Sequence, residues 1–326
     1  MLHKAGFTAV KGHGSANQQV LVAYFDGNHG YPSASIIAGT ESDIDAGKTT
    51  SQAINIPDFE EKASSHDRSN AAAVTITELV GGSQLRWQCL GNGHPLLLLP
   101  PLNMSINAWI QQITLLEGSS YAVHVPVYPG HLDNPLEKQS FSFAALVDEL
   151  CDYIKKHWPE EAVPVVGWSL GGCLALGLAC RAPELVTALV LVNSMAKPDE
   201  NLLANVSKLD DELCAHTDYL AALLNSQRSV PEELRAGAST QVLMHYYQML
   251  SNIDLREHLP RIMIPSLVVH GQRDPVILAS DLEELRQLGN VKIVKLETAG
   301  HFIPLLAAQY FNALLLDFLS MEHESL

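Results

Sequence analysis

This sequence has few basic residues, few cysteines and no long apolar run, and each shortage excludes a class of protein. Its 20 lysines and arginines stand against 36 aspartates and glutamates, which gives a formal net charge of −16. That field repels phosphate backbones and anionic lipid headgroups, so we expect neither nucleic acid nor a membrane surface as a partner. The longest nearly apolar run, residues 167–180, is shorter than the roughly 20 residues that a membrane-spanning helix needs.

The cysteines are odd in number, scattered through apolar stretches and never spaced C-x-x-C, so we expect reduced thiols in a reducing compartment. They are Cys89, Cys151, Cys173, Cys180 and Cys214. The first seven residues contain neither an uninterrupted apolar segment nor a small-residue cleavage pattern, which predicts that there is no signal peptide. We therefore expect a soluble, cytoplasmic protein.

Patterns that would bind a metal or a cofactor are also lacking. Histidines and carboxylates do not occur at the helical i, i+4 spacing of metal ligands beside a predicted cleft. Residues 39–49 end in Gly-Lys-Thr, but Ser42 stands where a P-loop requires its first glycine. The sequence predicts no metal and no cofactor.

The chain is long and apolar enough to bury a large core, because 47% of its 326 residues are hydrophobic. Residues 1–39 hold two apolar segments, 19–25 and 33–38, around a turn rich in glycine and asparagine, which predicts a hairpin-like extension. Residues 40–72 are polar and acidic, as a linker is.

From residue 74 onward, apolar strand patterns alternate with helical patterns, which predicts an α/β protein. Continuous apolar runs such as 96–99 are typical of a mostly parallel, twisted sheet with helices on both faces. Strands are expected at about 74–80, 85–90, 95–99, 121–127, 163–167, 187–192, 265–270 and 291–296, and helices near 107–117, 142–157, 170–181, 279–288 and 303–319.

One region interrupts this alternation. Residues 197–260 contain helical patterns, for example at 213–224 and 240–250, and no convincing strand. We interpret this region as a helical lid inserted into a core formed by residues 73–196 and 261–326.

A G-x-S-x-G pattern centred on Ser169 stands directly between an apolar strand and an apolar helix. A serine at such a turn adopts a strained backbone conformation, and Gly167 and Gly171 remove the Cβ atoms that would clash there. The turn also places Ser169 at a helix N-terminus, where the amide of Leu170 can face a developing oxyanion. The pattern therefore predicts a nucleophile.

A serine hydroxyl is a weak nucleophile, so this prediction requires an acid and then a base further along the chain. Asp274 follows the strand predicted at 265–270, although it could also form a turn before Pro275. His301 follows the strand predicted at 291–296. His131 also follows a strand, but it precedes the serine and fits supporting packing better than catalysis.

Over about residues 74–319 the chain resembles the α/β-hydrolase superfamily. The matching motifs are Gly167-Trp-Ser169-Leu-Gly171-Gly, His270-Gly-Gln-Arg-Asp274 and Ala-Gly-His301-Phe-Ile-Pro. Within it, the spelling of the first motif is similar to that of the carboxylesterases that remove a methyl ester from pimeloyl carrier protein, and of related acyl esterases and thioesterases. The resemblance implies an α/β-hydrolase fold and a triad of Ser169, His301 and Asp274.

The same resemblance implies a second oxyanion donor, and here the chain departs from the family. Members usually carry His-Gly after the third strand and use the next backbone amide, whereas this chain has Leu99-Pro-Pro-Leu102. The two prolines lack an N–H, so by position the donor would be the amide of Leu102. The expected oxyanion hole is thus Leu170 and Leu102.

We predict a serine hydrolase that cleaves an acyl ester or thioester, with an acyl carrier protein as a partner and release of its acyl chain as one form of the reaction. Acyl transfer or cyclisation on the same scaffold and a non-catalytic binding module are the alternatives. Within residues 1–39, the stretch Phe25-Asp-Gly-Asn-His-Gly-Tyr-Pro-Ser-Ala stands where the closing hairpin of ketosynthases has its glycine-rich turn. This resemblance implies a link to acyl assembly lines, and an unrelated extension is the alternative. The predicted docking patch for an acidic carrier is Arg235, Arg256 and Arg261.

Overall fold

The computed structural model describes residues 84–136, 141–198 and 234–323, with side chains to 320, and the backbone of four earlier strands. These strands are β1 (Gln18–Phe25), β2 (Ala34–Gly39), β3 (Thr50–Ile54) and β4 (Glu78–Leu79). The helix predicted at 213–224, most of the predicted lid and Cys214 lie outside the described residues.

The described strands form one eleven-stranded sheet in the order β3-β2-β1-β11-β10-β9-β8-β6-β7-β5-β4. The seven strands from β1 to β7 in this order run parallel, and each of the two outer strands on either side pairs antiparallel with its inner neighbour. The remaining strands are β5 (Arg86–Leu90), β6 (His94–Leu99), β7 (Tyr121–Val127), β8 (Val163–Trp168), β9 (Val186–Val192), β10 (Ser266–Gly271) and β11 (Val291–Leu296).

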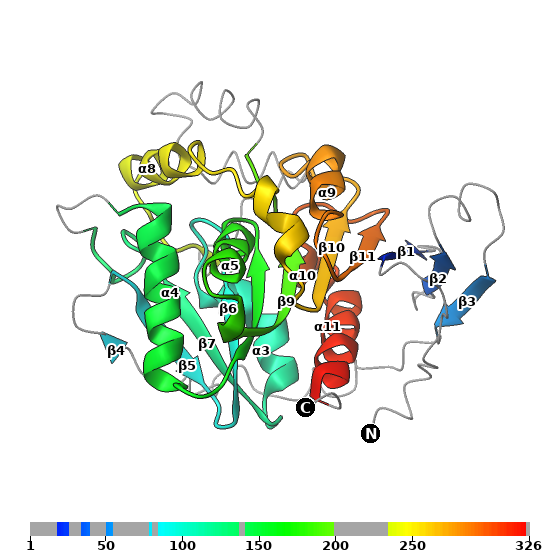
Figure 1. Ribbon diagram of the computed structural model, residues 1–326, viewed down its shortest axis with the longest axis horizontal. Coiled ribbons are helices and arrows are strands. Elements are labelled where there is room, and N and C mark those ends of the chain that lie inside the picture. The colour runs from blue at the N-terminus through cyan, green and yellow to red at the C-terminus, as the bar shows by residue number, and fades with distance from the viewer. Residues whose placement is uncertain are drawn as a thin grey trace.

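Helices cover both faces of the sheet (Figure 1). They are α3 (Ile110–Leu116), α4 (Phe143–His157), α5 (Leu170–Arg181), α8 (Thr240–Leu250), α9 (Ala279–Leu285), α10 (Ile303–Leu306) and α11 (Ala308–His323). Successive residues of a strand point to opposite faces, and β6 follows this rule. Leu97 and Leu99 pack into the core under α4, α5, α8 and α9, whereas Leu96 and Leu98 pack into the core under α3 and α11.

The predicted elements agree closely with the structure from β5 onward, and the α/β class with a mostly parallel sheet is confirmed. The exception is the helix predicted at 303–319, which is two helices, α10 and α11. Ala307 separates them with φ −121° and ψ 33°, outside the helical region. A periodic apolar pattern continues across such a break, so the pattern alone did not reveal it.

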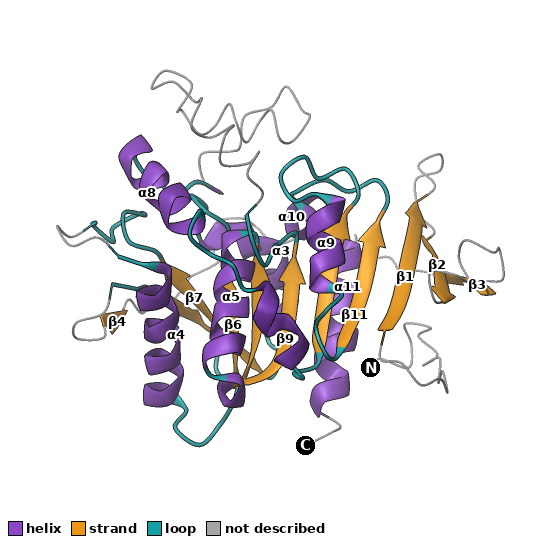
Figure 2. Ribbon diagram, turned by 45° about the horizontal axis from the view of Figure 1, so that its top comes forward, coloured by secondary structure: helices purple, strands orange, loops and turns teal. Residues whose placement is uncertain are grey.

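The N-terminal strands continue the sheet beyond β11 (Figure 2). β1 and β2 form the predicted antiparallel pair, and β1 also pairs in parallel with β11. β3 lies within residues 40–72, so the predicted polar linker contains a strand. A polar edge strand is held by backbone hydrogen bonds and needs no apolar pattern, which explains why the sequence did not indicate it. The domain division at residue 73 and the ketosynthase resemblance stay predictions.

The expectations about membrane spans and about cysteines can be compared with the described residues only. The longer helices of this part of the chain are too short or too polar to cross a membrane. Its four cysteines, Cys89, Cys151, Cys173 and Cys180, form no disulfide with one another, and burial raises the pKa of Cys173 and of Cys180 to about 11. These two thiols are therefore protonated at neutral pH.

A shortened chain that begins at Ala71 tests the proposed division. We expect it to fold and to hydrolyse a short p-nitrophenyl ester, because both described core clusters begin only at Leu85 or later. It should melt several degrees lower than the full chain, since β11 loses its ladder with β1. Circular dichroism melting and ester turnover measure both effects. Insoluble protein would mean that β1 to β3 belong to the core and that the boundary is misplaced.

Candidate active site

Ser169 occupies the turn between β8 and α5 and has φ 54° and ψ −117°. A positive φ is uncommon for a residue with a side chain and costs roughly 1–3 kcal/mol. Two hydrogen bonds connect the turn to the end of β9 and the loop after it: the Ser169 N–H donates to the carbonyl of Val192 (3.0 Å), and the Ser194 hydroxyl donates to the carbonyl of Ser169 (3.0 Å). The predicted nucleophile thus has the strained backbone that its motif implied.

The glycines on either side of Ser169 are required by close contacts. A Cβ atom on Gly167 would lie 2.6 Å from the Cα of Gly172. A Cβ atom on Gly171 would overlap the carbonyl oxygen of Leu99 and lie 2.8 Å from that of Pro100. The first turn of α5 therefore packs directly against the loop that follows β6.

His301 and Asp274 form a buried pair on the loops after β11 and β10. The Nδ1 of His301 lies 2.8 Å from the Oδ2 of Asp274, and both residues are less than a tenth exposed. The Oδ1 of Asp274 accepts the N–H groups of Val276 (2.8 Å) and Ile277 (3.1 Å). With its carboxylate held in this way, Asp274 orients the imidazole with the proton on Nδ1, which leaves Nε2 able to accept a proton.

Two residues that the sequence analysis did not single out hold the main chain of His301. The Asn193 amide donates to the carbonyls of Gly300 (2.9 Å) and His301 (2.9 Å) and accepts the N–H of Gly271 (2.8 Å). The indole of Trp168 donates to the same His301 carbonyl (3.0 Å). Asn193 is the first polar residue after the apolar β9, and this position was the available signal.

The hydrogen bond from the Trp168 indole connects His301 to the residue that directly precedes Ser169. The structure records no hydrogen bond between the Ser169 Oγ and the His301 Nε2 among the described residues. Such bonds are often long until a substrate closes the site. Ser169, Asp274 and His301 all follow the carboxyl ends of parallel strands, at one edge of the sheet.

The two expected oxyanion donors lie in segments that contact each other. Leu102 belongs to the loop of residues 100–105, here called the oxyanion loop, and Leu170 begins α5, which packs on this loop through Gly171. Among the described residues, neither the Leu102 amide nor the Leu170 amide donates a hydrogen bond. Both amides are therefore available as donors to a bound group.

His131 supports this loop, in agreement with the packing role predicted for it. Its ring is buried, its Nε2 accepts the N–H of Asn103 (3.1 Å), and its Nδ1 contacts the carbonyl of Pro129 (3.1 Å). Burial lowers the pKa of His131 to about 4, so the ring is neutral at neutral pH.

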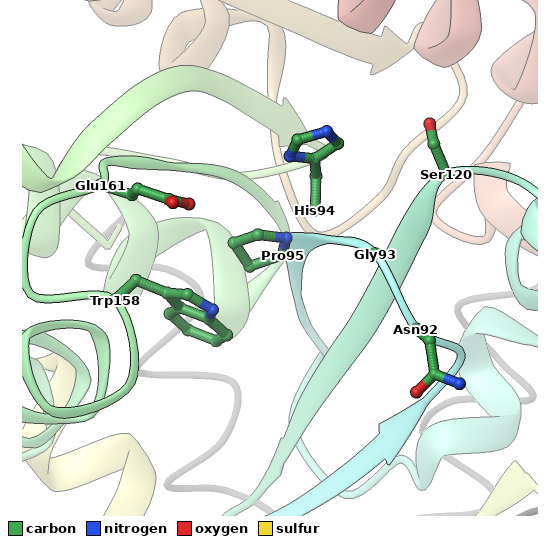
Figure 3. A pocket seen from close by; sticks show the side chains of 7 residues that line it. All are labelled: Asn92, Gly93, His94, Pro95, Ser120, Trp158 and Glu161. Carbon is green, nitrogen blue, oxygen red and sulfur yellow. The ribbon is translucent and has the colours of Figure 1, made fainter.

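A surface hollow lies at the opposite edge of the sheet and contains none of these residues (Figure 3). It measures about 510 Å³ and is formed around His94, Ser120 and Trp158, near the amino ends of the strands. In the part of the chain that the structure describes, three or more metal-ligating side chains do not gather at any point.

The chain resembles known proteins in sequence and in fold. A family model described as the alpha/beta hydrolase fold matches residues 94–215. A pimeloyl-[acyl-carrier protein] methyl ester esterase from Neisseria meningitidis is 30% identical over 211 residues, which cover 58% of this chain and 79% of that protein. The chain belongs to the α/β-hydrolase family. An esterase of the same name from Vibrio vulnificus is 29% identical over 226 residues, covering 62% of this chain and 86% of that protein.

Solved structures of α/β-hydrolase type have the same fold. A thermophilic esterase from Thermogutta terrifontis superimposes with a TM-score of 0.64 at 20% identity, over 73% of this chain and 94% of that one. A hydrolase from Pseudomonas aeruginosa gives a TM-score of 0.63 at 23% identity, over 72% and 94%. The predicted family and fold are confirmed, and this α/β hydrolase is an enzyme of the carboxylesterase type.

The indole of Trp168 offers a test of the support for His301. Trp168→Phe removes the donor to the His301 carbonyl, and we expect kcat for ester hydrolysis to fall about three- to tenfold, since one hydrogen bond contributes ~0.5–1.5 kcal/mol. Trp109→Phe is the matched control. Trp109 is equally buried in the same core, and its indole nitrogen has no partner among the described residues. Equal kcat losses in both variants, at equal melting temperatures, would contradict a specific role for the Trp168 bond.

Proposed function

We propose that this α/β hydrolase cleaves acyl esters or thioesters through an acyl-enzyme on Ser169, with His301 as general base and Asp274 as the residue that orients it. The observation that carries the proposal is the 2.8 Å contact between the His301 Nδ1 and the buried Asp274 carboxylate, at the same edge of the sheet as the strained Ser169. A base oriented by a third group beside a nucleophile is the arrangement that activates a serine hydroxyl.

In the first half of the reaction, the Ser169 Oγ attacks the carbonyl carbon of the substrate while its proton passes to the His301 Nε2. The negative charge that forms on the carbonyl oxygen accepts hydrogen bonds from the Leu170 and Leu102 amides. When the tetrahedral species collapses, the bond to the alcohol or thiol breaks and that group takes the proton from His301. Water then attacks the acyl-enzyme through the same proton transfers and releases the acid.

Acyl chains held on a carrier protein are the substrate class that we propose. Relatives that are 29–30% identical are named as esterases of a carrier-bound acyl methyl ester. Exposed leucines also follow three of the strand ends at this edge: Leu132 after β7, Leu278 after β10 and Leu306 after β11. Exposed apolar side chains at this edge would favour an apolar acyl chain over a polar substrate.

The basic patch expected to dock such a carrier is smaller than the sequence implied. Arg256 forms ion pairs with Asp254 (2.6 Å) and Glu284 (3.4 Å), which balance its charge locally. Arg261 forms no ion pair with a described residue. In a protein with a net charge of −16, docking of an acidic carrier would depend on Arg261 more than on Arg256.

Ser169→Ala tests the nucleophile. We expect turnover of a short p-nitrophenyl ester to fall at least about a thousandfold, with the fold intact, because triad members act as a unit. A fluorophosphonate probe should label the native enzyme and leave this variant unlabelled. Ser266→Ala serves as the control. Ser266 is buried, and it lies at the amino end of β10, whereas Ser169 follows the carboxyl end of β8. Activity of Ser169→Ala within about tenfold of the native enzyme would contradict the assignment.

A second experiment tests the carrier. The substrate is one dicarboxylic acyl chain with a terminal methyl ester, presented either on a carrier protein or on free pantetheine. We expect a higher kcat/KM for the carrier conjugate, and the preference should weaken as salt rises because screening reduces charge attraction. Intact mass spectrometry of the carrier identifies whether the methyl ester or the thioester is cleaved. Equal specificity constants that do not respond to salt would instead describe a generalist esterase.

A further inference from the structure

The oxyanion loop is held at two points on either side of Leu102. The Tyr128 hydroxyl donates to the carbonyl of Pro100 (2.9 Å), and the Asn103 N–H donates to the His131 Nε2 (3.1 Å). Asn103 has φ 58°, a strained value for a residue with a side chain. Between these two points stands the Leu102 amide, which donates to no described residue and is left available for the substrate.

The hydrogen bonds of His131 require a single arrangement of its protons. The Asn103 N–H can only donate, so Nε2 must be an acceptor without a proton. The carbonyl of Pro129 can only accept, so the ring proton must be on Nδ1. Edge-on contacts with the rings of Tyr246 (5.2 Å between centroids) and Tyr128 (5.8 Å) hold the imidazole in its plane. The ring is thus a rigid, neutral acceptor for one backbone amide.

The same residues connect the oxyanion loop to the segment that leads into α8. The Asn103 carbonyl accepts the N–H of Ala236 (3.0 Å), and its side-chain oxygen accepts the N–H of Ala238 (2.9 Å). From α8, the Tyr246 hydroxyl donates to the carbonyl of Pro129, the group that the His131 Nδ1 also contacts. Asn103 is therefore fixed from three directions, and His131 supplies the contact to its main-chain N–H.

We propose that His131 is a positioning residue for the oxyanion hole, which acts through Asn103 to aim the Leu102 amide at the carbonyl oxygen of the substrate. The inference rests on the proposed function, because it requires an oxyanion at this place. The residue touches no reacting atom. Its effect is on the direction of an amide that stabilises charge only in the transition state, so it affects kcat rather than substrate binding.

The experiment compares two substitutions of His131 in the full-length enzyme. His131→Phe keeps an aromatic ring but removes the acceptor, and we expect kcat to fall about ten- to a hundredfold with KM within twofold, somewhat less than the loss of an oxyanion donor itself. In His131→Gln the side-chain oxygen reaches the position of Nε2 and accepts the Asn103 N–H, so kcat should recover to within about threefold of the native value. His245→Phe is the control, since His245 is a half-buried histidine of α8 that contacts the Phe141 carbonyl instead.

A second readout separates positioning from general damage to the fold. A boronic acid that forms a tetrahedral anion on Ser169 should bind His131→Phe more weakly, by the same factor as the loss in kcat, while a fluorophosphonate still labels Ser169. If His131→Phe does not fold, Tyr128→Phe replaces it, because it removes the hydrogen bond that holds the loop at Pro100, on the other side of Leu102. Equal losses in folded His131→Gln and His131→Phe, or unchanged kcat in both, would overturn the proposal. A native enzyme that does not depend on Ser169 would instead overturn the proposed function.

Discussion

The contact between the first turn of α5 and the end of β6 is the constraint on which this site depends. Gly171 lies against the carbonyls of Leu99 and Pro100, so close that a single methyl group would not fit. This contact brings the turn of Ser169 beside the oxyanion loop and places the Leu170 and Leu102 amides in neighbouring segments. Leu99, Leu102 and Leu170 are all buried in the same core, so both segments are anchored where they meet.

The polar groups buried at this edge satisfy one another. Asp274 receives two backbone amides and the His301 imidazole, Asn193 makes three hydrogen bonds, and His131 is bonded through both ring nitrogens. An unmet buried donor or acceptor would cost ~1–3 kcal/mol, so each side chain has little freedom to choose another partner. The network therefore specifies geometry: it sets the tautomers of two histidines and the direction of the loops that carry them.

Much of the fold was predictable because its signals are local. The strands at 121–127 and 291–296 were predicted at their observed limits, since apolar runs between turn residues identify buried strands. The break at Ala307 and the polar strand β3 were not predicted, because neither changes the hydrophobic pattern. Pairing of β1 with β11 joins residues more than 260 positions apart, and such a partner cannot be read from either segment alone.

The sequence by itself determined the order of Ser169, Asp274 and His301 and the need for glycine at 167 and 171, because a strand-to-helix turn limits which residues fit. Only the tertiary structure decided that Asn193 and Trp168 hold His301, and that His131 holds Asn103. These contacts join loops from β7, β8, β9 and β11 with partners distant in sequence. The physical reason is that a hydrogen bond depends on direction and on distances of about 3 Å, which packing of the whole sheet sets and residue type does not.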